Sequence, residues 1–178
     1  MELYKKNLKK LIEGKVYHPS FEHDACGVGL VASTEGKKSR KIVEFGIDAL
    51  KAVWHRGAVD ADGKTGDGAG IHIEIPRDFF IERIENAGRR HEEGTICVGM
   101  IFLPRNDYVF QEKCKTLVEN ELLRKNYYIY RWRQVPVNTR VLGIKAESNR
   151  PEIVQVIFKC NDKNLKSDDL ERDLFVVR

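Results

Sequence analysis

The sequence predicts an α+β fold in which helices cover a β-sheet. Segments with the period of a helix alternate along the chain with segments that have the character of strands. Residues 95–103 form an almost continuous apolar run, which is typical of a strand in a sheet covered on both faces. Residues 71–75 alternate isoleucine with polar side chains, which is the pattern of a strand with one buried face.

Apolar residues at helical spacing predict four helices and a fifth helical segment near the end of the sequence. Gly14 ends the first helix, Gly57 caps the second, Pro76 opens the third and Asp107 caps the fourth. The last segment, 167–177, is a helix or a helix–strand joint. The four helices are expected over residues 3–13, 40–54, 76–87 and 107–122. The buried stripe of the fourth is expected to comprise Phe110, Cys114, Leu117, Val118 and Leu122.

Strands are expected over residues 26–32, 71–75, 95–103, 127–135 and 152–160. Between the first two of these strands lies a loop rich in glycine and aspartate, residues 58–68. Its Asp60–Asp62–Gly63 pattern resembles the start of a calcium loop. The later ligands and the closing glutamate do not follow, so a calcium site is not expected there.

Composition favours one globular domain with a core. The chain has 178 residues and a net charge of +4, and its basic residues lack the clustering with aromatics that nucleic-acid binding needs. No apolar run approaches the roughly 20 residues that cross a bilayer, so no membrane association is expected. Neither the four separated cysteines nor His72 and His91 have metal-ligand spacing. Reduced cysteines and the absence of a secretory signal indicate the cytoplasm.

Cys26 is the candidate around which the sequence is organised. It precedes Gly27-Val28-Gly29 and a short apolar run, so it is either a small core residue or a nucleophile left uncovered by glycines. The nearest histidines, His23 and His55, do not form a clear pair with it.

Several motifs then occur in a fixed order: His23-Asp-Ala-Cys26-Gly-Val-Gly, His55-Arg-Gly-Ala, Thr65-Gly-Asp-Gly-Ala-Gly, and Val135-Pro-Val-Asn followed by Val141-Leu-Gly. Together they resemble the glutamine amidotransferase domain of glutamate synthase large subunits, a class II amidotransferase of the N-terminal-nucleophile hydrolase type. The resemblance implies a four-layer αββα sandwich, present here only in part. It also implies a propeptide or N-terminal arm over residues 1–25 and the front part of the domain, cut short, over residues 26–178.

The resemblance implies that Cys26, freed by cleavage after Ala25, attacks the side-chain amide of L-glutamine with its own α-amino group as base. It places Arg56, Gly57 and Asp67 at the substrate. From the residues alone, the favoured interpretation of Arg56 is a cation at a helix end, and Asp67 is equally well an ordinary turn residue that shapes its loop.

The family places FMN, an iron–sulfur cluster and the 2-oxoglutarate site in domains outside this region, so no cofactor or metal is expected here. The expected partners are the remaining domains of the large subunit and its small subunit, with no nucleic acid and no membrane. The chain contains no Asn-Gly pair, which in the family supplies the oxyanion donors, so this chain alone is expected to be inactive. Another class II amidotransferase, such as an asparagine synthetase or amidophosphoribosyltransferase, and a non-catalytic assembly module remain open alternatives.

Overall fold

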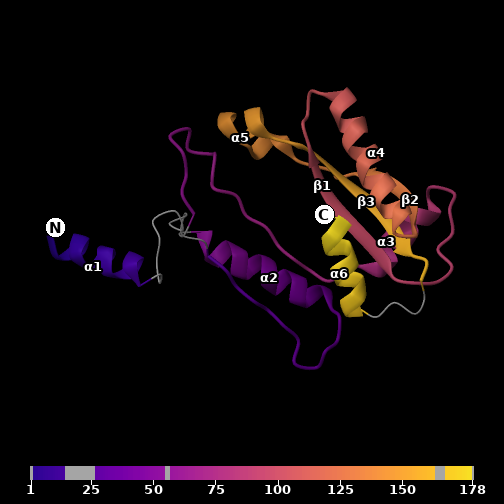
Figure 1. The fold of residues 1–178 in the computed structure, drawn as a ribbon, viewed down its shortest axis with the longest axis horizontal. Helices are drawn as coiled ribbons and strands as arrows, with labels where there is room; N and C mark the ends of the chain where they lie inside the picture. The colour runs from indigo at the N-terminus through magenta and orange to yellow at the C-terminus, as the bar shows by residue number, and fades with distance from the viewer. Residues whose placement is uncertain (1, 15–26, 55–56, 163–166, 178) are drawn as a thin grey trace. The chain divides into compact units, whose positions relative to one another are not determined.

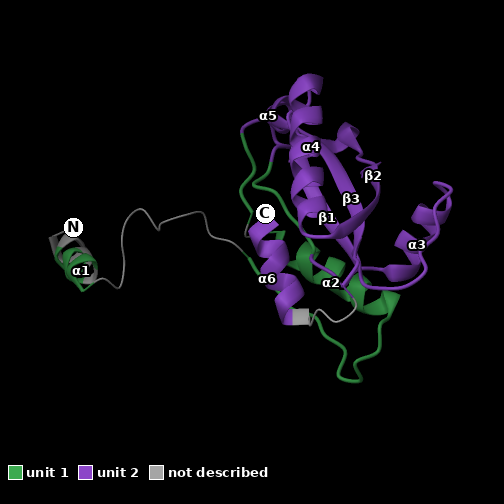
Figure 2. Ribbon diagram, turned by 45° about the vertical axis from the view of Figure 1, so that its right-hand side comes forward, with its two compact units in different colours: residues 1–60, 66–71 green, residues 61–65, 72–178 purple. Residues whose placement is uncertain are grey.

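The computed structural model describes residues 2–14, 27–54, 57–162 and 167–177 (Figure 1). The chain divides into two compact units (Figure 2). The first unit comprises residues 1–60 and 66–71, and the second comprises residues 61–65 and 72–178.

Two helices belong to the first unit. They are α1 (Glu2–Glu13) and α2 (Arg40–Ala52), close to the predicted positions. Helix α2 begins where the Ser39 hydroxyl accepts a hydrogen bond from the Lys41 backbone nitrogen at 3.1 Å. It ends earlier than predicted, because its C-cap is Val53, whose N–H bonds back to the Ala49 carbonyl. The prediction of Gly57 as the cap is therefore wrong.

The second unit contains a three-stranded sheet of β1 (Ile96–Leu103), β2 (Tyr127–Gln134) and β3 (Glu152–Cys160). The strand order is β1-β3-β2, so β3 is central, and it is antiparallel to both neighbours. Cys97 lies opposite Phe158 and Tyr127 lies opposite Cys160. All three strands were predicted from the sequence and are confirmed.

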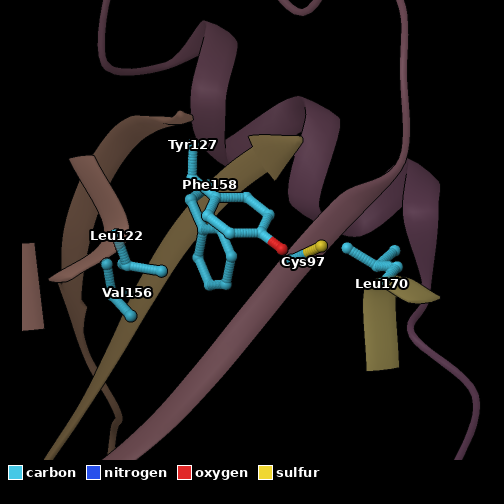
Figure 3. Packing of buried hydrophobic residues seen from close by; sticks show 6 residues of the cluster. All are labelled: Cys97, Leu122, Tyr127, Val156, Phe158 and Leu170. Carbon is cyan, nitrogen blue, oxygen red and sulfur yellow. The ribbon is translucent and has the colours of Figure 1, made fainter. Parts of the chain in front are cut away.

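Helices pack against both faces of this sheet. Helix α3 (Arg77–Glu85) places Phe80 and Ile84 against Ile96, Tyr130 and Ile157. Helices α4 (Tyr108–Arg124) and α6 (Ser167–Val177) lie on the opposite face. The buried residues of that second cluster, drawn in Figure 3, are Cys97, Leu122, Tyr127, Val156, Phe158 and Leu170. Two short helices, η3 (Thr139–Val141) and α5 (Ile144–Asn149), lie between β2 and β3 along the chain.

Helix α4 begins at the predicted cap, since Asp107 Oδ1 accepts a hydrogen bond from the Phe110 backbone nitrogen at 2.9 Å. Its buried face differs from the predicted stripe. Leu122 is buried as predicted, whereas Phe110 and Leu117 are exposed. The buried side chain on the first turns is instead Gln111, whose amide donates to the Pro104 carbonyl at 2.8 Å and so needs no apolar partner.

Two predicted strands do not form. Residues 27–32 and 71–76 have no regular secondary structure, and Cys26 lies outside the described residues. Val28 and Leu30 are each 91% exposed, and the isoleucines of residues 71–75 are exposed as well. The prediction that β1 is covered on both faces holds at its start, where Ile96 and Cys97 are buried, but fails further along, where Met100 and Phe102 are exposed. The described sheet is therefore one part of the expected sandwich.

Candidate active site

Cys26, the candidate nucleophile, lies outside the described residues, as do His23 and His55. The chain directly after it, Gly27 to Ala32, is irregular and mostly exposed. The alternative to a nucleophile was a core role for Cys26 at the start of a buried strand. No such strand follows Cys26 in the described residues, so this alternative is not supported.

The other three cysteines are free thiols whose surroundings indicate a structural role. Cys97 is buried among apolar side chains on the α6 face of the sheet (Figure 3), and burial raises the pKa of its thiol to about 12. A thiol with so high a pKa holds almost no thiolate at neutral pH and cannot be an efficient nucleophile. Cys114 and Cys160 are half-buried, and Cys160 packs against the same apolar cluster.

Arg56 also lies outside the described residues, while its neighbour Gly57 is described. The Gly57 backbone nitrogen donates to the Trp54 carbonyl at 3.0 Å, which closes a turn after helix α2. A Cβ atom at position 57 would lie 3.4 Å from the same carbonyl, which is an ordinary van der Waals distance, so the turn itself does not require glycine.

Asp67 closes the loop that follows this turn. Its Oδ2 accepts a hydrogen bond from the Ala58 backbone nitrogen at 2.8 Å. The neighbouring residues Val59 and Gly66 form an antiparallel bridge. Asp67 therefore shapes the loop, and its contact with glutamine stays a prediction.

Asp62 and Thr65, within the same loop, have contacts that the sequence analysis missed. The Asp62 carboxylate accepts hydrogen bonds from the backbone nitrogens of Lys64 at 2.9 Å and Thr65 at 2.7 Å. The Thr65 hydroxyl donates to Asp62 Oδ2 at 2.6 Å. An aspartate three residues before a threonine in an Asp-Gly-Lys-Thr segment is a signal for such a turn. Both residues also lie against Gly143, where a Cβ atom would come within 2.6 Å of the Thr65 backbone nitrogen, and the sequence gives no local signal for this contact.

The described histidines show no sign of a role as base. His72 is exposed, and His91 bonds through Nδ1 to the Tyr130 hydroxyl at 2.7 Å and through Nε2 to Arg77 at 3.3 Å. Arginine only donates, so Nε2 accepts and Nδ1 carries the proton. His91 is thereby fixed as a neutral, structural side chain beside the buried Tyr130.

Residues 26–178 match the family model described as "Glutamine amidotransferases class-II". That match covers most of the chain, so the chain belongs to the class-II glutamine amidotransferases. The mixed helix and sheet of the structure agrees with part of such a domain.

Within that family, the chain is similar to glutamate synthases. It is 50% identical over 98% of its length to the large chain of the NADPH glutamate synthase of Azospirillum brasilense, and 34% identical over 92% to that of Bacillus subtilis strain 168. It is 40% identical over 88% to the ferredoxin-dependent glutamate synthase of Pyropia yezoensis. The chain spans only 10–12% of the length of these relatives.

No helix in the described ranges is long and apolar enough to cross a membrane.

Proposed function

We propose that residues 26–178 form the front part of the glutaminase domain of a glutamate synthase, with Cys26 as the nucleophile. The observation that carries the proposal is the family match, whose first residue is Cys26. Residues 1–25 are then a propeptide, and cleavage after Ala25 gives Cys26 a free α-amino group. The burial of Cys97 and its raised pKa support Cys26 by making the best-described alternative thiol unreactive.

A free α-amino group has a pKa of about 7.7–8.0, so it can take the thiol proton at neutral pH. The thiolate attacks the side-chain amide carbon of L-glutamine, and the C–N bond breaks as the ammonium group returns a proton to the leaving nitrogen. Ammonia departs and a γ-glutamyl thioester remains on Cys26. Water then cleaves the thioester, which yields glutamate and restores the thiol.

Arg56 is proposed to act at the glutamine site, where it either holds a carboxylate or orients main chain, because a guanidinium stays charged and offers several donors. Gly57 is proposed to let the backbone approach the substrate closely, because it has no side chain, and Asp67 shapes the loop that follows. The turn at Gly57 and the Asp67–Ala58 hydrogen bond support this assignment, since they order the chain next to Arg56.

The released ammonia is proposed to serve glutamate synthesis from 2-oxoglutarate elsewhere in a larger protein. The relatives' names and the small share of their length that this chain spans support this step. FMN and an iron–sulfur cluster would then belong to the remaining domains, and a small subunit and the cytoplasm are the proposed partner and compartment. The other class II amidotransferases, asparagine synthetases among them, have no specific observation in their favour.

Glutaminase assays on the complete protein with single cysteine replacements test the proposal. We expect Cys26→Ala to abolish ammonia release from glutamine, whereas Cys114→Ala and Cys160→Ala retain it. Mass spectrometry of the mature protein should find Cys26 as the first residue. A mature protein that starts at Met1, or full activity in Cys26→Ala, would instead favour the non-catalytic assembly module.

A further inference from the structure

Three half-buried arginines meet on the face of the sheet that carries helix α3. They are Arg83 of α3 and Arg131 and Arg133 of β2. The guanidinium carbons of Arg83 and Arg133 lie 4.7 and 5.3 Å from the centre of the Phe79 ring. Arg131 Nη1 donates to the Arg83 carbonyl at 3.1 Å, which brings the third guanidinium to the same place. All four residues belong to the second unit.

Among the contacts of the residues that the structure describes, a single carboxylate reaches these arginines. It belongs to Glu82, which pairs with Arg83 at 2.7 Å and whose side chain is 60% exposed. Arg131 donates to backbone carbonyls, and Arg133 donates to the amide oxygen of Gln155 at 2.7 Å. Three positive charges and one negative charge leave a surplus of two in these described contacts. Because partly desolvated like charges repel one another, this surplus favours the approach of an anion.

Gln155 indicates which kind of anion fits. It lies on the central strand and is 8% exposed. Its Oε1 accepts from Arg133, and for its amide nitrogen the described contacts include no acceptor. This nitrogen is reachable from outside, since no fully buried side-chain nitrogen or oxygen of the described residues lacks a partner. Free N–H groups of a guanidinium and an amide side by side match the two oxygens of a carboxylate.

Exposed apolar side chains adjoin this set of donors. Met100 of β1 is directly opposite Gln155, and Phe102 is opposite Ile153 on the same strand pair. The side chains of Met100, Phe102 and Gln155 share one face, because opposite residues and alternate residues of a strand point the same way. Met100 is 49% exposed and Phe102 is 63% exposed. A free anion would leave both in water, whereas a protein segment would cover them.

We propose that a segment of the larger protein, outside residues 1–178, docks on this face. It places a carboxylate of an aspartate or glutamate at Arg133 and Gln155, and apolar side chains on Met100 and Phe102. Charge complementarity selects the carboxylate, and the similar glutamate synthases, of whose length this chain spans 10–12%, have ample further polypeptide to supply it. The inference rests on one part of the proposed function, that this chain belongs to a larger protein, and it gives these residues no role in the chemistry of Cys26.

Oxidation of Met100 in the complete wild-type protein tests the contact without any substitution. Hydrogen peroxide transfers an oxygen atom to the sulfur of an accessible methionine and is itself reduced to water. N-acetylmethionine amide in the same solution gives the rate for an uncovered side chain. We expect Met100 to be oxidised at least about fivefold more slowly than this reference, because the docked segment covers it. A smaller difference would overturn the inference.

Arg133→Lys then identifies the carboxylate. The substitution keeps the charge and introduces a primary amine, which a carbodiimide joins to a carboxylate in contact as an amide, taking up the released water as a urea. Mass spectrometry of the complete protein should find the peptide with position 133 linked to an aspartate or glutamate outside residues 1–178. The matched control is Arg124→Lys, because Arg124 Nη2 lies 2.6 Å from Glu121 on its own helix, so its link should form within α4.

Two results of the cross-linking would overturn the inference. One is a link from position 133 only to carboxylates within residues 1–178, and the other is no link at position 133 while the Arg124→Lys control reacts. Neither measurement uses the reactivity of Cys26. The glutaminase assays therefore test the proposed activity separately, and failure of one can be told from failure of the other.

Discussion

Asp173 links helix α6 to the sheet, and its replacement tests how much this link stabilises the packed helix. Its Oδ1 accepts a hydrogen bond from Lys125 Nζ at 2.5 Å, and its Oδ2 accepts one from the Tyr127 hydroxyl at 2.8 Å. Tyr127 is buried, whereas the side chains of Lys125 and Asp173 are 31% and 23% exposed. We predict that Asp173→Ala loosens α6 from the sheet.

The expected loss of stability in Asp173→Ala comes mainly from the buried Tyr127 hydroxyl, which loses its acceptor. A buried polar group left without a partner costs about 1–3 kcal/mol. Loss of the ion pair between partly exposed groups adds at most about 1 kcal/mol to this cost. Alanine is a better helix former than aspartate, which offsets roughly 0.5 kcal/mol of it. The net cost is therefore about 2 kcal/mol, which corresponds to a rise of about 30-fold in the equilibrium constant for opening of α6. Tyr127→Phe should cost less, because it removes the donor and leaves Asp173 bound to Lys125.

Hydrogen exchange of the α6 backbone amides, read by mass spectrometry, measures this opening directly. The control is Arg172→Ala on the same helix, since Arg172 is 82% exposed and 3.7 Å from its partner Asp169. We expect exchange to rise about 30-fold in Asp173→Ala and by less than about threefold in the control. Exchange in Asp173→Ala within about threefold of wild type, or equal effects in the two variants, would refute the reasoning.

Three further predictions follow from single residues. Arg56→Lys should lower kcat/KM for glutamine although the charge is kept, because an ammonium lacks the planar fork; unchanged steady-state kinetics would return Arg56 to a helix-end role. Ile84→Ala should lower the free energy of unfolding by about 2–5 kcal/mol, measured by urea denaturation, since Ile84 is fully buried between α3 and the sheet; a smaller loss would mean that the site collapses around the cavity. Burial, with the charges of Arg77 and Lys159, lowers the pKa of His91 below its ordinary value, so its contribution to stability is complete above about 6.5 and is lost as the pH falls below it. The pH dependence of unfolding should shrink in His91→Gln, and an unchanged dependence would contradict this account.

Sequence reasoning succeeded where a segment carries its own signals. Asp107 caps α4 as predicted, and the apolar residues of 40–52 and 96–103 suffice to define a helix and a strand. The same reasoning failed for residues 27–32 and 71–75, whose patterns are equally strand-like. A strand needs a neighbouring backbone to pair with, and no described segment pairs with either one.

The residues of the candidate site also differ in how far the local sequence could predict their contacts. Gly57 and Asp67 could be selected from local motifs, and their backbone contacts lie within a few residues or one loop. The contact of Thr65 with Gly143 could not be predicted, because it joins two segments whose approach depends on the fold of the chain between them. Likewise, the burial of Gln111 in place of Phe110 depends on a bond to the Pro104 carbonyl, which periodicity of apolar residues does not represent.

The strand order β1-β3-β2 also sets the order in which the sheet can assemble while the chain is being synthesised. Both outer strands precede the central strand, so neither can pair within this sheet until residues 152–160 have left the ribosome. Until then β1, an eight-residue segment without a charged side chain, has no partner strand in the described sheet. A ribosome that pauses before β3 has emerged therefore presents a nascent chain open to chaperones and to association with its neighbours. Once residues 152–160 have left the ribosome, the three strands can pair.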